Sequence, residues 1–235
     1  MKIKHVILEN FRKYKEPTKI DIGELTAFIG KNDAGKSTVL EALDIFFENN
    51  TTKMTPEDAC VSGERNRVRI GVVFDKIPEQ LDIDAGALTT LQAEHLLNAD
   101  GFLELHKTYD CTKSTMTPKV STMAVHPSSD AVKGLISKKN ADLKKLVKDA
   151  GVEANCHLNN NPSMRQALYD CVSELNLVLQ EVQLNDGDAK NIWEAVKRHL
   201  PIYALFRSDR SSSDQDPEVQ DPMKLAIRSA LAENA

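Results

Sequence analysis

The sequence predicts an α/β fold in which a glycine-rich loop, an antiparallel meander of strands and a helical section follow one another. Three observations support this class. Short runs alternate apolar and polar residues, the glycine loop lies between an apolar run and an amphipathic run, and the region after residue 128 has helical apolar spacing. The 235 residues, 41% of them hydrophobic, are enough for one large domain.

The N-terminal part is expected to begin with strands. Residues 2–9 alternate well enough for a strand, a basic loop follows at 10–15, and residues 18–22 predict a second strand before Gly23 turns the chain. The short apolar run at 25–29 is expected to be a third strand, which leads into the glycine loop.

The loop reads Gly-Lys-Asn-Asp-Ala-Gly-Lys-Ser-Thr over residues 30–38, the phosphate-binding pattern G-x-x-x-x-G-K-[ST]. Gly30 and Gly35 permit close backbone approach, and the following helix presents its positive end to an anion. We expect Lys36 to act at the β- and γ-phosphates and Ser37 to ligate Mg²⁺. The chain is therefore predicted to bind a nucleoside triphosphate. The expected contacts in the loop are Gly30, Lys31, Asn32, Asp33, Ala34, Gly35, Lys36, Ser37 and Thr38.

A helix is expected to leave the loop over 38–47, where apolar residues recur at helical spacing. Strands are predicted at 67–75, 101–110 and 120–125, with a short helix at 88–98. The three strands would form an antiparallel meander.

Helices are predicted next at 130–149, 162–179 and 188–200. Six lysines between 133 and 148 favour a solvated helix face over a binding site.

The chain is thus expected to have three regions. Residues 1–127 carry the glycine loop and the meander, and residues 128–200 form a helical section. Residues 201–235 hold a returning strand, a polar loop and the start of a helical arm. The returning strand is predicted at 201–206 and the final amphipathic helix at 223–232.

Net charge, cysteine spacing and the lengths of the apolar runs limit which partners, metal sites and cellular locations are expected. A formal net charge of −5 gives no overall basic field of the kind that indicates nucleic acid, although a local basic face remains compatible with it. The four cysteines lack a C-x-x-C pair that would indicate a zinc or redox site. No apolar run approaches the roughly 18 residues of a membrane span, and no secretory signal is recognisable, so a cytoplasmic setting is expected.

The first 50 residues resemble the ATPase head of the ABC-type group that includes SMC proteins, RecF and the OLD (overcoming lysogenization defect) family. The strand at 2–9 and the following Asn10-Phe11-Arg12-Lys13-Tyr14 are similar to the NF[RK] element of that group. The glycine loop and the continuation Val39-Leu40-Glu41-Ala42-Leu43 look most like OLD-type ATPases, and the segment 200–206 is also similar to theirs.

This resemblance implies a P-loop NTPase of the ABC-ATPase type that binds ATP and Mg²⁺. It implies a role for Arg12 at the bound phosphates, where a planar guanidinium pairs well with phosphate oxygens. It places Asn32 near the γ-phosphate, whereas Asp33 departs from the commoner glycine. In such proteins ATP joins two heads, and the complete protein acts on DNA in repair or phage defence, in some cases as an endonuclease.

Two parts of such a head lack a convincing counterpart, namely a Walker B strand that ends in Asp-Glu and a signature loop. Residues 61–65 look like a signature loop and 70–75 like a Walker B strand. Both come too soon after the glycine loop, and Lys76 stands where the Glu is needed. We therefore expect an incomplete head, whose hydrolysis needs a C-terminal lobe. In the OLD family a Toprim nuclease domain would follow.

Two other functions stay open at this point. A P-loop kinase for a small molecule would have a parallel five-stranded core and an arginine-rich lid. A nucleotide-binding module without turnover of its own is the other alternative.

Overall fold

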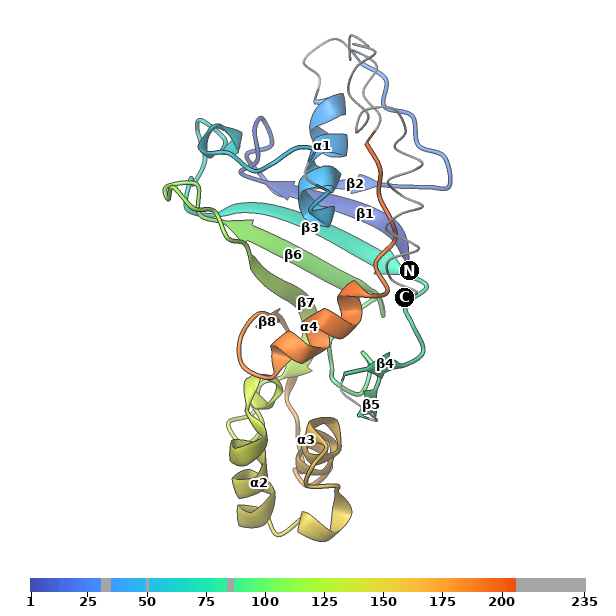
Figure 1. The fold of residues 1–235 in the computed structure, drawn as a ribbon, viewed down its shortest axis with the longest axis vertical. Helices are drawn as coiled ribbons and strands as arrows, with labels where there is room; N and C mark the ends of the chain where they lie inside the picture. The colour runs from blue at the N-terminus through green and yellow to red at the C-terminus, as the bar shows by residue number, and fades with distance from the viewer. Residues whose placement is uncertain (31–34, 50, 84–86, 206–235) are drawn as a thin grey trace, which may run out of the picture.

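The computed structural model describes residues 1–30, 35–49, 51–83 and 87–205 (Figure 1). Its main feature is a six-stranded sheet with the strand order β2-β1-β3-β6-β7-β8, in which every neighbouring pair is antiparallel. The strands are β1 (Lys2–Glu9), β2 (Thr18–Asp21), β3 (Val68–Asp75), β6 (Leu103–Tyr109), β7 (Lys119–Pro127) and β8 (Leu177–Gln183). Two short strands, β4 (Leu81–Asp82) and β5 (Leu88–Thr89), pair separately.

Two helices, α1 (Lys36–Phe47) and α4 (Ala189–Lys197), lie on the same face of this sheet (Figure 1). A second helical pair, α2 (Asn140–Asp149) and α3 (Asn161–Asp170), extends away from the sheet and has a small apolar core of its own. Single 3-10 turns occur at η1 (Pro56–Asp58), η2 (Leu135–Ser137) and η3 (Glu153–Asn155).

The main core forms because β3 buries alternate side chains beneath α1. Val68, Ile70, Val72 and Phe74, which share one face of the strand, are all fully buried, and Arg69 and Val73 on its opposite face are only 8% and 2% exposed. Phe46 of α1 packs against Phe74 with ring centroids 6.3 Å apart. Burying each such side chain contributes about 1.5–3 kcal/mol.

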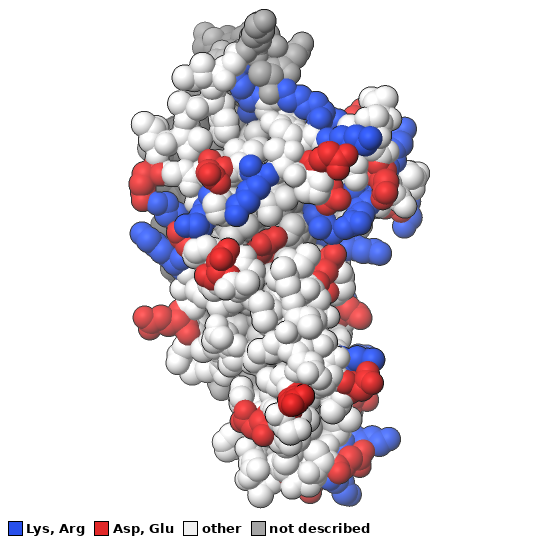
Figure 2. All heavy atoms as spheres, turned by 180° about the vertical axis from the view of Figure 1, so that it is seen from behind, with Lys and Arg blue, Asp and Glu red and all other residues white. Residues whose placement is uncertain are grey.

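The other face of the sheet is polar over its central strands. Arg69 of β3 pairs with Glu9 of β1 at 3.6 Å and with Glu181 of β8 at 3.1 Å, so one arginine links carboxylates from strands on either side of β3. Figure 2, which looks at the molecule from behind, shows Lys, Arg, Asp and Glu side chains spread over this face. The sheet thus has one apolar face, beneath the helices, and one charged face.

Most of the predicted elements are confirmed. The helix expected at 38–47 is α1, and the helix expected at 188–200 is α4. The predicted meander is confirmed because β3, β6 and β7 are consecutive antiparallel neighbours. The strands expected at 2–9, 18–22, 67–75, 101–110 and 120–125 correspond to β1, β2, β3, β6 and β7.

Two of the predicted strands, 25–29 and 201–206, are wrong where the structure describes them. Residues 25–29 form no strand and pair with no strand of the described residues, and Leu25 and Ile29 are 93% and 94% exposed. Residues 201–205 also form no strand; instead Tyr203 stacks on Phe47 of α1, and its hydroxyl donates to the Leu40 carbonyl at 2.8 Å. Residue 206 and the predicted helix at 223–232 lie outside the described residues.

The region 128–200 is less helical than expected. The helix predicted at 130–149 begins only at Asn140. Gly134 has a left-handed φ of 70°, which a continuous α-helix through this position would not allow. The helix predicted at 162–179 ends at Asp170, and 177–183 pairs with β7 as strand β8. The helix predicted at 88–98 is replaced by β5 and a series of turns.

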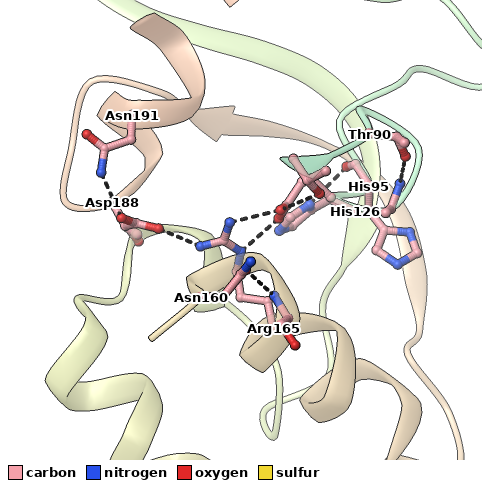
Figure 3. A network of polar contacts seen from close by, with 12 residues as sticks. Thr90, His95, His126, Asn160, Arg165, Asp188 and Asn191 are labelled. Carbon is pink, nitrogen blue, oxygen red and sulfur yellow. Dashed lines mark hydrogen bonds and ion pairs between the residues drawn. The ribbon is translucent and has the colours of Figure 1, made fainter. Parts of the chain in front are cut away.

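A buried ion network joins the helical pair to the rest of the molecule (Figure 3). Arg165 of α3 donates from Nε and Nη2 to both carboxylate oxygens of Glu94, at 2.8 Å each, and from Nη1 to Asp188 at 2.6 Å. The side chains of these three residues are at most 7% exposed. Thr89 and Asn191 donate further hydrogen bonds to the two carboxylates, so both carboxylates have more than one partner.

We predict that Arg165→Met lowers the free energy of unfolding by about 3–5 kcal/mol, because it leaves two buried carboxylates without their cation. Urea denaturation at pH 7 measures this. Arg198→Met, which removes an exposed arginine at the end of α4, is the control and should change stability by less than about 0.5 kcal/mol. Equal, small effects of the two substitutions would contradict a stabilising role for the network.

Candidate functional site

The N-terminus of α1 is the centre of the candidate site. Gly35 occupies the N-cap position in a left-handed conformation, with φ 82° and ψ 18°, which glycine adopts without strain. Glycine has no side chain with which to cap the helix, and no acidic residue lies in the first turn. The positive end of the helix dipole is therefore not neutralised by residues of its own first turn.

Five of the predicted loop residues are described. Gly30 is exposed and irregular, Gly35 and Thr38 are buried, Lys36 is half-buried, and the Ser37 side chain is exposed in the first turn of α1. Lys36 Nζ donates to the Gly30 carbonyl at 2.7 Å, so the lysine spans the loop from its end to its beginning.

The other four predicted contacts, Lys31, Asn32, Asp33 and Ala34, lie outside the described residues.

The loop after β1 folds back towards α1. Asn10 and Arg12 both have left-handed φ values, of 55° and 51°, and the Phe11 N–H donates to the Tyr14 carbonyl at 3.0 Å to close a tight turn. Phe11 is fully buried and anchors the turn. The Asn10 side chain stabilises the turn by donating to the Arg67 carbonyl at 3.0 Å.

Arg12 extends from this turn to two carboxylates. Its Nε lies 2.8 Å from Asp58 of η1, and its Nη1 lies 2.6 Å from Glu41 of α1. Burial lowers the pKa of the guanidinium, but the hydrogen bonds to Asp58 and Glu41 raise it more, so this pKa lies above its ordinary value. Arg12 thus links the turn after β1 to α1 and η1. Its expected role at bound phosphates stays a prediction.

Sequence reasoning did not single out the partners of Arg12 or the contact made by Tyr14. Asp58 belongs to a capping box with Thr55, a Thr-x-x-Asp pattern that can be found in a sequence. Tyr14 donates from its hydroxyl to the Gly35 carbonyl at 3.4 Å, and no local pattern predicts this contact across 21 positions. Burial raises the pKa of the Tyr14 phenol, which keeps this donor protonated.

The segments that look like a signature loop (61–65) and a Walker B strand (70–75) do not lie beside parallel strands in the described residues. Residues 61–65 form an exposed turn in which the Val61 side chain is fully exposed. Residues 70–75 belong to β3, whose neighbours β1 and β6 both run antiparallel to it. The segment 176–183, which is apolar but lacks the Walker B aspartate, contains the edge strand β8.

Comparison with known protein families places the chain in one of them. A family model described as an AAA ATPase domain covers residues 1–235. No curated protein matches the chain. Within the described residues, no helix combines the length and the apolar character needed to cross a membrane.

We predict that Arg12→Met lowers the free energy of unfolding by about 1–3 kcal/mol in the absence of nucleotide, because Asp58, whose side chain is 9% exposed, loses its charged donor. Chemical denaturation measures the loss. Lys15→Met removes an exposed cation from the same loop and should have almost no effect. If Arg12→Met were as stable as Lys15→Met, the two ion pairs would not hold the loop in place.

Proposed function

Since the chain belongs to the AAA ATPase domain family, we propose that it binds ATP with Mg²⁺ at the N-terminus of α1. The observation that carries this proposal is the Gly-Lys-Ser-Thr sequence at an uncapped helix start, with Lys36 extended across the loop to Gly30. Backbone N–H groups, a helix dipole and a lysine ammonium together suit a polyphosphate.

In this proposal Lys36 contacts the β- and γ-phosphates and Ser37 supplies an oxygen ligand to Mg²⁺. The donor chemistry fits, because Mg²⁺ prefers hard oxygen ligands and the Ser37 side chain is exposed in the first turn of α1. The metal would bridge and neutralise phosphate oxygens. The loop residues 30–38 would supply the remaining contacts.

We predict that Lys36→Ala weakens Mg²⁺-dependent ATP binding by about 10- to 100-fold, as loss of a charge-assisted contact does. Titration calorimetry with the whole chain measures this. Lys53→Ala, which removes an exposed lysine shortly after α1, is the control and should bind as the unmodified chain does. Unchanged binding by Lys36→Ala would remove the basis of the proposal.

The finer proposal is an ABC-type head related to OLD, SMC and RecF proteins, which couples ATP to DNA handling. It is supported by the tight Asn-Phe-Arg turn beside α1 and by the antiparallel sheet on which α1 packs. A small-molecule kinase is less well supported. Such a kinase is expected to have a parallel core, whereas every strand pair in the described residues is antiparallel.

Hydrolysis by the chain alone is proposed to be slow, because the Walker B-like segment 70–75 is followed by Lys76 in place of the glutamate that would activate water. ATP would then act mainly by joining two heads.

We predict that ATP with Mg²⁺ shifts the chain from monomer towards dimer in light scattering after gel filtration. Lys36→Ala should stay monomeric under the same conditions. An ATP-bound chain that stays monomeric while turning ATP over rapidly would contradict the ABC-type head and favour a self-contained enzyme.

A further inference from the structure

Lys13, which the sequence pattern does not single out, lies directly against the end of the glycine loop. A β-carbon built on Gly35 would lie 2.0 Å from Cε of Lys13, 2.7 Å from its Nζ and 3.0 Å from the Tyr14 hydroxyl oxygen. The two side chains thus occupy the space that any larger residue at position 35 would need. Gly35 is required here for this close approach as well as for its left-handed backbone.

The two neighbouring cations of the turn have different surroundings. Arg12 forms ion pairs with Asp58 and Glu41. The ammonium of Lys13 lies beside the backbone of Gly35. The left-handed φ of Arg12 redirects the chain between the two residues. Tyr14 supports the position of the lysine, because its ring centroid lies 6.0 Å from Lys13 Nζ and its hydroxyl reaches the Gly35 carbonyl.

The charge of Lys13 adds to the positive potential at the start of α1. Gly35 is the N-cap of α1, so a charge beside it adds to the positive end of the helix dipole. Lys36 supplies a second ammonium from the next residue in the chain. Two ammonium groups that approach one helix start from different segments would both place positive charge near a polyphosphate bound there.

We propose that Lys13 is a phosphate-binding residue of this site and that Arg12 serves chiefly to hold the turn that presents it. This inference rests on the proposed function, because it needs a polyphosphate at the start of α1. It assigns the basic contact from the β1–β2 loop to a residue next to the one that the resemblance indicates.

The competing explanation is that Lys13 only packs on Gly35. The two explanations differ for Lys13→Met, which keeps most of the side-chain volume and removes the charge, and for Lys13→Arg, which keeps the charge. If the charge matters, Lys13→Met should weaken binding of Mg²⁺-ATP by about tenfold or more, and Lys13→Arg should restore most of the affinity. The melting temperature without nucleotide should change little in both variants.

Lys15→Met is the matched control, since it removes one cation from the same exposed loop and should leave ATP affinity unchanged. Inorganic tripolyphosphate, used to displace a fluorescent ATP analogue, should show the same loss with Lys13→Met. Such a loss would place the contact on phosphate and not on the nucleoside.

Three results would overturn the inference. If Lys13→Met binds ATP normally while Lys36→Ala does not, Lys13 is no phosphate ligand, although the proposed function stands. If Lys13→Met and Lys13→Arg both lower the melting temperature and the affinity to the same extent, the role of Lys13 is packing. If the unmodified chain binds neither ATP nor tripolyphosphate, the inference and the proposed function fail together.

Discussion

The packing of α1 against the apolar face of the sheet is the contact on which the candidate site depends. Phe46 packs on Phe74, and Lys107 of β6 places its ammonium 5.3 Å from the Phe46 ring while pairing with Glu48 at the end of the helix. Burial lowers the pKa of Lys107, and the bond to Glu48 opposes that shift. Because the core holds α1 through its buried residues, from Thr38 to Phe46, packing also sets the position of its first turn, against which the loop that reaches Gly35 packs.

The turn after β1 is that loop, and several contacts hold it in place. Phe11 is buried in the core, the Arg12 N–H donates to the Asp58 carbonyl at 2.6 Å, and the Cys60 N–H donates to the Asn10 carbonyl at 2.7 Å. The Arg12 guanidinium adds ion pairs to α1 and η1. The burial of Phe11, two backbone hydrogen bonds and two ion pairs thus hold one six-residue turn (10–15) in place. Such support lets a flexible side chain like that of Lys13 act at a defined point.

The sequence predicted those elements whose local pattern and final neighbours agree. The strand β3 begins with alternating apolar and polar residues, and α1 follows a glycine loop with apolar residues at helical spacing, so both are recognisable without the fold. The apolar runs at 25–29 and 177–183 show the limit of this reasoning. A strand exists only with a partner: 177–183 finds β7, whereas 25–29 has no strand beside it in the described residues.

The candidate site shows the same division between local and tertiary information. Lys36 and Ser37 follow from a contiguous motif, since loop and helix are adjacent in the chain. The contacts of Arg12 with Asp58, and of Lys13 with Gly35, join residues 46 and 22 positions apart, and their geometry depends on two left-handed residues that no hydrophobic pattern encodes. A basic pair such as Arg12-Lys13 therefore predicts a cation near the loop, while only the fold shows that Arg12 pairs with Asp58 and Glu41 and that Lys13 lies against the start of the helix.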